Sequence, residues 1–352
     1  MLVNEEALKH EILRIINMVR NAKTKEDLRK IYMAFVYKKY INDDVDEKYY
    51  EYVARPEEID PRKIMPKLVV VSTKKERELF KYLSYYWSFP VSEGIGRRIK
   101  ILVFDEQNGK VIGLIGLKDP VIALGPRDRH IGWDEETKIE YLNHVMDVHV
   151  LGAIPPYNAL LGGKLIACLL RSRELNEIIA RKFTFKHGFP VVLYTTITVY
   201  GKSTMLSGTE WLYIGETKGT STFHLDYAKL RELVGEDGKK YKFEHGPNYP
   251  LRLAKLVSKR LGFDITKVGI KRGIYVLPLS SNYRDVLNGR ALPAFDLVVP
   301  LNNIACSIKE RYIIPRSNRV GVTRAPRVSE LMEIAKEYYL QIFGVIWHAD
   351  GS

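Results

Sequence analysis

Several side chains able to carry acid–base chemistry fall in one short stretch of the sequence. Asp147 and His149 stand two residues apart in a run that alternation predicts to be a strand, so both should project from one face. A carboxylate beside an imidazole forms a pair that can move protons. We therefore predict that Asp147 acts as the general base, with His149 as a second catalytic candidate.

The predicted strand over residues 144–154 runs into a proline turn and then a helix over residues 158–173. A helix N-terminus offers N–H groups without partners and the positive end of the helix dipole, which together favour an anion. Two glycines there permit close approach, although packing of the helix on the sheet through small residues explains them equally well. With one aromatic residue from a neighbouring loop, the residues expected to hold substrate or cofactor are Tyr157, Asn158, Gly162, Gly163, Lys164 and Trp133.

Two further candidates for catalysis lie beyond this stretch. Ser203 follows a β-branched strand over residues 191–199 and is either an activated hydroxyl or the N-cap of a short helix after Gly201. His224 ends a polar segment, and a lone histidine is commonly structural. Asp147, Glu216 and His224 could together bind a divalent metal, but no ligand spacing is diagnostic, so we assign no metal residues.

The balance of charge points to a polyanionic partner. Lysine and arginine number 55 against 42 aspartates and glutamates, which gives a formal net charge of +13. A solvated basic surface is the alternative, yet the basic residues stand beside aromatic ones, as in nucleic-acid-binding proteins. Arg127 and Arg129 are expected in a polar loop that ends at Trp133, whose ring could stack on a base. The residues predicted to contact nucleic acid are Arg97, Arg98, Arg127, Arg129, Lys202, Lys218, Lys271, Arg272, Arg316 and Arg319.

The elements that must position these residues follow from hydrophobic periodicity. Helices are expected over residues 5–18, 25–39, 135–143, 250–261 and 328–343, and strands over 99–104, 111–117, 144–154, 191–199, 211–216 and 273–278. Asn108-Gly109 predicts a hairpin turn. This order favours an α/β or α+β fold with a mixed central sheet. We divide the chain into a helical N-terminal region (1–66), a core (67–224) and a basic C-terminal region (225–352).

Composition excludes several classes of protein. Hydrophobic residues make up 46% of the 352, which is enough for a substantial core, and two cysteines cannot form a disulfide framework. No run approaches the roughly 20 apolar residues of a membrane-spanning helix, and the acidic N-terminus does not resemble a signal peptide. We expect a cytoplasmic protein without a membrane partner. Its low glutamine content lies in the direction of thermophilic proteins.

Five longer motifs occur in order along the chain, at Pro90–Arg98, Ile112–Pro120, Arg127–Trp133, Asp147–Leu165 and Tyr213–His224. They resemble the DruA family, which is named for the Druantia anti-phage system. The similarity spans Pro90 to His224 and continues weakly to Gly289. It implies a core like that of the GNAT acetyltransferases, together with a more distant likeness to phage Mom proteins, which modify adenine in DNA on a similar core.

The same resemblance bears on the cofactor. In true acetyltransferases, the strand and helix that correspond to the Asp147–Leu165 motif cradle the pyrophosphate of coenzyme A, with the pattern Arg/Gln-x-x-Gly-x-Gly/Ala. Here Asn158 replaces the first residue of that pattern and Leu161 replaces the first glycine. We therefore expect acetyl-CoA to bind weakly. The cofactor stays open, with a divalent metal as another candidate.

Together these features favour a DNA-acting enzyme of phage defence or of a mobile element. The leading hypothesis is a base-modifying transferase whose target base flips into a pocket between Trp133, Tyr157 and Ser203. One alternative is a metal-dependent DNA-binding or strand-processing protein, of nickase or transposase type, without an acyl cofactor. Another is a small-molecule N-acetyltransferase. The expected partners are DNA and other proteins of the defence system or mobile element.

Overall fold

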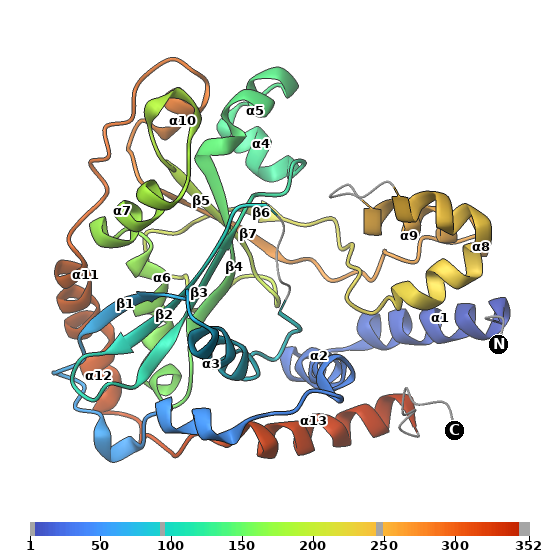
Figure 1. Ribbon diagram of the computed structural model, residues 1–352, viewed down its shortest axis with the longest axis horizontal. Helices are drawn as coiled ribbons and strands as arrows, with labels where there is room; N and C mark the ends of the chain where they lie inside the picture. Colours follow the sequence, from blue (N-terminus) through green and yellow to red (C-terminus); the bar gives the residue numbers. More distant parts are fainter. Residues whose placement is uncertain (1–3, 92–95, 244–248, 345–352) are drawn as a thin grey trace.

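A mixed seven-stranded sheet lies at the centre of the molecule (Figure 1). The computed structural model describes residues 4–91, 96–243 and 249–344. The strand order is β1-β2-β3-β4-β5-β7-β6, and every neighbouring pair is antiparallel except β4 and β5, which run parallel. The strands are β1 (Pro66–Val70), β2 (Arg98–Asp105), β3 (Val111–Lys118), β4 (Val145–Ala153), β5 (Leu193–Ile197), β6 (Leu212–Glu216) and β7 (Gly273–Pro278).

Helices cover both faces of the sheet because its central strands are apolar on both sides. In β3 every residue but the last is buried, the pattern of a strand enclosed between two layers. Helices α6, α7 and α11 pack on one face and α3 on the other. The helices are α1 (Glu5–Asn21), α2 (Lys25–Tyr40), α3 (Lys74–Ser84), α4 (Gly125–Ile131), α5 (Glu135–Tyr141), α6 (Gly162–Leu169), α7 (Arg173–Lys182), α8 (Tyr227–Phe243), α9 (Tyr249–Leu261), α10 (Tyr283–Leu287), α11 (Leu301–Ile308), α12 (Ile314–Ser317) and α13 (Val328–Phe343).

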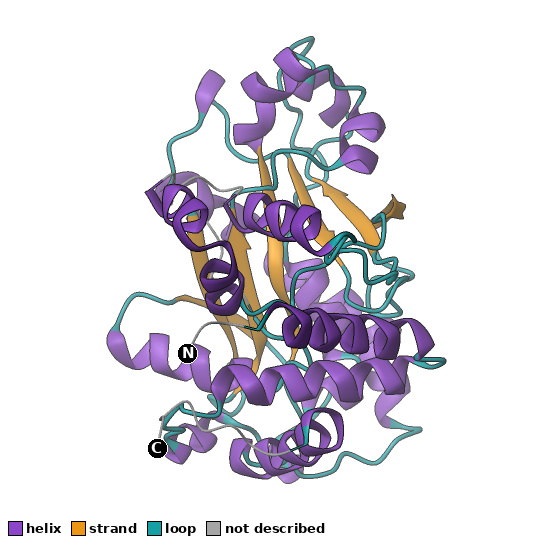
Figure 2. Cartoon of the chain, turned by 90° about the vertical axis from the view of Figure 1, so that its right-hand side faces the viewer, coloured by secondary structure: helices purple, strands orange, loops and turns teal. Residues whose placement is uncertain are grey.

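Helices from both ends of the chain form one unit beside the sheet, drawn in front of the strands in Figure 2. Leu8 and Ile12 of α1 share a core with Leu230 of α8 and Leu253 of α9, and α13 packs along α2. The C-terminal part also supplies β7, which lies between β5 and β6. The boundary expected at residue 224 therefore runs through the sheet. Among the described helices, none is long and apolar enough to cross a membrane.

Most predicted elements are present with nearly the expected bounds. The α2 helix begins after a capping box in which Thr24 accepts from the N–H of Asp27, and Gly109 of the predicted hairpin turn has a φ of +70°. Three expectations were wrong. The polar loop at Arg127 is helix α4. The helix expected over 158–173 is a 3₁₀ turn followed by the shorter α6, and a separate helix, α7, begins at Arg173. The segment after Gly201 is an irregular loop rather than a helix.

Candidate functional site

A cleft opens where the parallel strands β4 and β5 stop pairing. Their ladder covers only Val145–Asp147 against Leu193–Thr195. Just beyond it, β4 contains a bulge, because Gly116 pairs with Val150 while Leu117 pairs with Val148, and His149 is the extra residue. A Cβ at Gly116 would lie 3.0 Å from Cε1 of His149. A glycine in β3 thus makes room for the bulge that brings the imidazole to the cleft.

The cleft has two contiguous compartments. The larger has a volume of about 450 Å³ and the smaller about 400 Å³. Both are floored by the later half of β4 and are closed by the segment after α3 on one side and the loop after β5 on the other. Five residues line both compartments, namely Trp87, Ser88, Leu151, Thr204 and Met205.

Aromatic, hydroxyl and basic side chains line the larger compartment. Trp87 and Phe89 supply rings, and the Ser88 hydroxyl lies 2.8 Å from that of Tyr200, joining the two sides. Lys25 and Lys202 stand at its edge. No aspartate or glutamate lines either compartment, so the described walls carry positive charge without local compensation. Such a surface favours an anionic ligand that also presents a planar apolar group.

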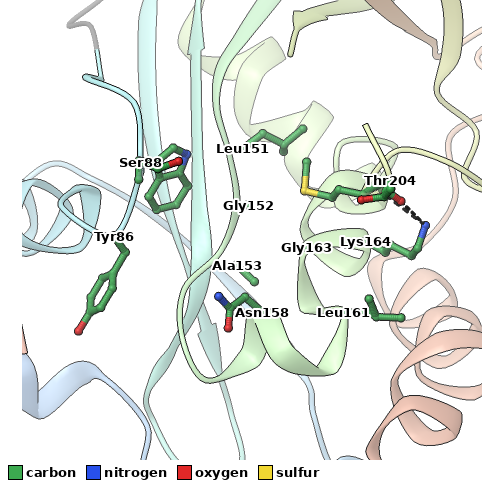
Figure 3. A pocket seen from close by; sticks show the side chains of 12 residues that line it. Tyr86, Ser88, Leu151, Gly152, Ala153, Asn158, Leu161, Gly163, Lys164 and Thr204 are labelled. Atoms are coloured by element: carbon green, nitrogen blue, oxygen red, sulfur yellow. Dashed lines mark hydrogen bonds between the residues drawn. The ribbon is translucent and has the colours of Figure 1, made fainter. Parts of the chain in front are cut away.

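The smaller compartment lies against the N-terminus of α6 (Figure 3). The Lys164 amino group donates to the carbonyls of Thr204 at 3.0 Å and Met205 at 3.3 Å, and also to that of Ser207. Burial lowers the pKa of Lys164. Lys164, which the sequence predicts to bind a ligand, instead holds the loop after β5 against α6 through these hydrogen bonds.

The two glycines of the predicted anion site have packing roles. A Cβ at Gly162 would lie 2.7 Å from the carbonyl oxygen of Tyr157, and one at Gly163 would lie 2.9 Å from Sδ of Met205. Leu161, directly before them, has a φ of +61° and lines the smaller compartment. The Met205 side chain thus covers Gly163, where a pyrophosphate would have to approach.

The structure brings together some of the residues predicted from the sequence and leaves others outside. His149, Lys202 and Ser203 line the larger compartment, while Asn158, Gly163 and Lys164 line the smaller. Sequence reasoning missed Trp87, Tyr200 and their neighbours, because no local pattern links the segment after α3 with the loop after β5. The remaining candidates, Asp147, Tyr157, Gly162, Trp133 and His224, line neither compartment.

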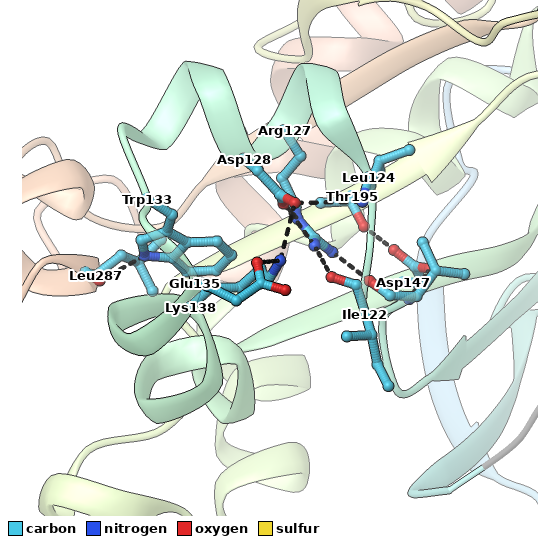
Figure 4. A network of polar contacts seen from close by, with 11 residues as sticks. Ile122, Leu124, Arg127, Asp128, Trp133, Glu135, Lys138, Asp147, Thr195 and Leu287 are labelled. Atoms are coloured by element: carbon cyan, nitrogen blue, oxygen red, sulfur yellow. Dashed lines mark hydrogen bonds and ion pairs between the residues drawn. The ribbon is translucent and has the colours of Figure 1, made fainter. Parts of the chain in front are cut away.

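Asp147 lies within a buried polar network rather than in the cleft (Figure 4). Its carboxylate accepts from the hydroxyl of Thr195 and, at 3.2 Å, from the backbone N–H of Val121. Burial raises the pKa of Asp147 to about 6. Because both carboxylate oxygens are engaged by the protein, the prediction of a general base at Asp147 is corrected to a structural role.

Arg127 and Trp133 belong to the same region, beneath α4. The Arg127 guanidinium is fully buried, donates to the carbonyls of Val121 at 2.8 Å and Ile122 at 3.0 Å, and pairs with Asp128 at 2.7 Å. The ring of Trp133 lies 5.4 Å from the guanidinium, and its N–H donates to the carbonyl of Leu287. The expected basic and aromatic rim is therefore an internal anchor at Arg127, against which the half-buried Trp133 packs.

Two other candidates are also internal. The hydroxyl of Tyr157 donates to Asp105 at 2.8 Å, on the far side of its 3₁₀ turn from the cleft. His224 is buried in the helical unit with Nε2 2.9 Å from the carbonyl of Ile265, and burial lowers its pKa to about 4. Neither is placed to touch a substrate in the cleft.

The basic residues predicted to bind nucleic acid divide by exposure. Arg97 pairs with Asp119 at 2.6 Å, Arg316 donates to the carbonyl of Ala159 at 3.2 Å, and burial lowers the pKa of Arg272. The exposed members are Arg98, Arg129, Lys202, Lys218, Lys271 and Arg319. Arg98 and Arg129 lie toward the start of β4, at the opposite end of the sheet from the cleft.

The proposed metal ligands do not come together. Within the described parts of the chain, no group of three or more His, Cys, Asp or Glu side chains is close enough to hold a metal ion. Asp147 is enclosed by Thr195 and Val121, whereas Glu216 is exposed at the end of the edge strand β6. His224 lies in the helical unit. These three residues therefore give no support to the strand-processing alternative.

Comparison with known proteins identifies relatives over most of this fold. A family model described as "Druantia protein DruA" matches residues 12–289, from α1 through all seven strands. The Druantia protein DruA of Escherichia coli (strain UMEA 4076-1) is 38% identical over 313 residues, which cover 81% of this chain and 77% of that protein. No solved structure matches the chain with significance.

Proposed function

Because the chain belongs to the DruA family of Druantia anti-phage defence proteins, we propose that it acts on DNA, as a base-modifying transferase working with other components of such a system. One observation carries the proposal. The cleft at the end of the β4–β5 pairing is lined by rings, hydroxyls, an imidazole and lysines, and by no carboxylate among its described walls. That lining suits a base and its phosphates, whereas magnesium, a common metal of phosphodiester cleavage, is usually held by carboxylates.

The larger compartment receives the target base. Trp87 and Phe89 line this compartment, and a base turned out of its stack can pack against their rings. The hydroxyls of Thr196, Thr198 and Ser203 offer donors and acceptors for its polar edge. Of the three residues that the sequence predicts around the flipped base, Ser203 lines this compartment. Trp133 and Tyr157 do not line it, and Trp87 and Phe89 take their place in the proposal.

His149 accepts the proton in the proposed reaction. When the exocyclic amino group of a base attacks an activated donor, a bond forms from nitrogen to the transferred group, and the bond from that group to its carrier breaks. The carrier leaves with the bonding electrons, and the proton lost from nitrogen must go to a base within hydrogen-bond reach. His149 lines the larger compartment from the β4 bulge, among walls that contain no carboxylate. In a neutral imidazole one ring nitrogen carries the lone pair that takes up such a proton.

The donor enters from the smaller compartment, and the residues there do not fit acetyl-CoA. In a GNAT-like core the turn from β4 into α6 would cradle a pyrophosphate. Here Leu161 and Met205 fill the approach to Gly163, and the Lys164 amino group is already bonded to three carbonyls. Coenzyme A therefore has no part in the proposed reaction. The mixed sheet and the β4–turn–α6 unit support the GNAT-like description of the fold.

Mass spectrometry of nucleosides tests the proposal. DNA is incubated with the protein and the small-molecule fraction of a cell extract, then digested to nucleosides. We expect a nucleoside of increased mass that His149→Ala abolishes and Arg129→Ala, an exposed residue at the other end of the sheet, leaves unchanged. DNA that is nicked, or unaltered, with the wild-type protein contradicts a transferase.

A further inference from the structure

We propose that the DNA received by the cleft is an unpaired strand, which lies along the groove between two sets of cations that the fold leaves without ion pairs. This inference rests on the proposed function and names the form of its substrate. The set at the larger compartment, the lysine end, comprises Lys25, Lys202 and Lys271. The set at the smaller compartment, the arginine end, comprises Arg311, Arg316 and the exposed Arg319, whose backbone N–H donates to the carbonyl of Arg316 at 2.9 Å.

The lysine end is a cluster of three exposed ammonium groups and a ring. Lys25 begins α2, and its amino group lies 3.4 Å from the carbonyl of Lys202. The carbonyl of Lys271 lies 3.8 Å from where a Cβ on Gly201 would be, so Lys271 stands next to the same loop. The Lys202 amino group is 4.7 Å from the centre of the Tyr213 ring, which is 38% exposed. Cations interleaved with an exposed ring suit phosphates and bases of a single strand.

The arginine end borders the smaller compartment. Arg316 donates to the carbonyl of Ala159, the neighbour of Asn158 in the wall. Arg311 lies 5.2 Å from the ring centre of Tyr312, and the same ring is 4.9 Å from the Lys164 amino group. Figure 3 shows the helices of this segment beside Leu161 and Lys164. Arg311 and Arg316 thus place positive charge at the second mouth of the groove.

Neighbouring arginines have their charge compensated. Arg324 pairs with Glu330 at 2.9 Å, and Arg327 lies 3.7 Å from Glu47. No carboxylate lies within ion-pair distance of the six cations at the two ends, among the residues that the structure describes. The charge that remains for an external anion is therefore gathered at the two mouths of the cleft.

The shape of the site favours an unpaired strand over a duplex. The two compartments lie next to each other and share five lining residues, which makes the site a recess, whereas readers of duplex grooves insert a projecting helix or ribbon. Duplex DNA is stiff over about 150 base pairs, and turning out a paired base costs a few kcal/mol. An unpaired strand bends freely and presents its bases to Trp87 without that cost.

Fluorescence anisotropy with a labelled deoxyoligonucleotide, its duplex and the RNA of the same sequence tests this inference. We expect the unpaired DNA to bind at least about tenfold tighter than the duplex. The pair Lys202→Ala/Lys271→Ala, and separately Arg311→Ala/Arg319→Ala, should each lower the slope of log affinity against log salt by roughly 0.7 per charge removed. Arg324→Ala is the matched control and should leave the slope unchanged. Trp87→Ala should weaken strand binding about tenfold or more, with Trp87→Phe retaining it.

The outcomes separate this inference from the function on which it rests. Equal or tighter binding of the duplex, with the same dependence on the two cation pairs, overturns the unpaired strand and leaves DNA as the substrate. Tighter binding of RNA overturns the choice of DNA. Absence of binding to every oligonucleotide at low salt overturns both the inference and the proposed function.

Discussion

The cleft beside β4 and the buried network under α4 both contain basic and aromatic side chains, yet only the cleft is open to a ligand. Under α4, the Lys138 amino group lies 2.5 Å from Glu135 and 3.7 Å from Asp128, which also holds Arg127 (Figure 4). In the cleft, no carboxylate lines the described walls. A buried charge must be paired, so the network supports the fold, while cations left uncompensated beside a hollow are available to an anion.

The difference is visible at two basic residues of one helix. Arg127 of α4 is fully buried and makes bonds with carbonyls on the loop before it, whereas Arg129 is exposed. The motif Arg127–Trp133 therefore contains one arginine that anchors the fold, Arg127, and one that carries its charge at the surface, Arg129. Removing a side chain whose charge is paired under α4 should therefore destabilise the fold, whereas removing an exposed charge should not.

The largest expected effect is at the anchor. Arg127→Ala leaves Asp128 and two carbonyls without their donor, and breaking a buried pair in this way costs about 3–5 kcal/mol of the free energy of unfolding. Denaturant unfolding measures it, with Arg129→Ala as the control on the same helix, for which we expect a change within about 0.5 kcal/mol. Equal, small effects at the two positions would contradict a structural role for the network.

Asp147 should behave as part of the same anchor. Asp147→Ala leaves the N–H of Val121 and the hydroxyl of Thr195 without an acceptor, at a cost of about 1–3 kcal/mol each. Asp147→Asn keeps an acceptor and should retain both fold and activity. Because burial raises the pKa of Asp147 to about 6, the unfolded chain releases the proton first, and the wild type loses stability relative to Asp147→Asn as the pH rises from about 4 through 6.

A fully folded Asp147→Asn variant without activity would restore Asp147 as a catalytic group. Thermal unfolding at several pH values and the nucleoside assay, carried out on the same preparation, distinguish the two roles.

Lowering the pH should destabilise the protein because His224 is buried in the helical unit. Burial lowers the pKa of His224 to about 4, so between about pH 6.5 and 4 the unfolded chain takes up a proton that the folded chain does not. Stability therefore falls as the pH is lowered, by on the order of 2 kcal/mol at pH 5 from this group. His224→Gln should show a smaller loss between pH 7 and 5. An identical pH profile for wild type and variant would mean that His224 is not buried in its neutral form.

The smallest expected signal is the binding of acetyl-CoA. With Leu161 and Met205 in the approach to Gly163, we expect calorimetry to give a dissociation constant no tighter than roughly millimolar, about −4 kcal/mol. Leu161→Gly relieves the positive φ, opens the compartment and should tighten binding. Micromolar binding that Gly163→Val abolishes would instead favour an acetyltransferase.

Much of the fold was predictable because local signals agreed with the tertiary structure. The strands and the Asn108-Gly109 turn occur where the sequence places them. Helix α4 was missed although Pro126 at its start and Gly132 at its end are helix-boundary signals, because its polar composition favoured a loop. The helix expected from Asn158 is broken at Leu161, whose left-handed conformation no local preference predicts.

The site was predictable only in part, and for a physical reason. Spacing places Asp147 and His149 on one strand, but the bulge opposite Gly116 sends the imidazole to the cleft and leaves the carboxylate in the network. Whether a charged residue has an ion-pair partner can depend on residues that are far away in the sequence. The contact of Ser88 with Tyr200, which closes the larger compartment, joins residues 112 positions apart.

Photo-crosslinking tests the central claim most directly, that the cleft and not the network under α4 receives DNA. The wild-type protein is irradiated in complex with an oligonucleotide that carries a photoreactive base, and the crosslinked peptides are sequenced by mass spectrometry. The account predicts crosslinks in the peptides that contain Trp87 and Tyr200, which line the larger compartment. Crosslinks to the peptide that contains Trp133, with none to the cleft, would contradict it.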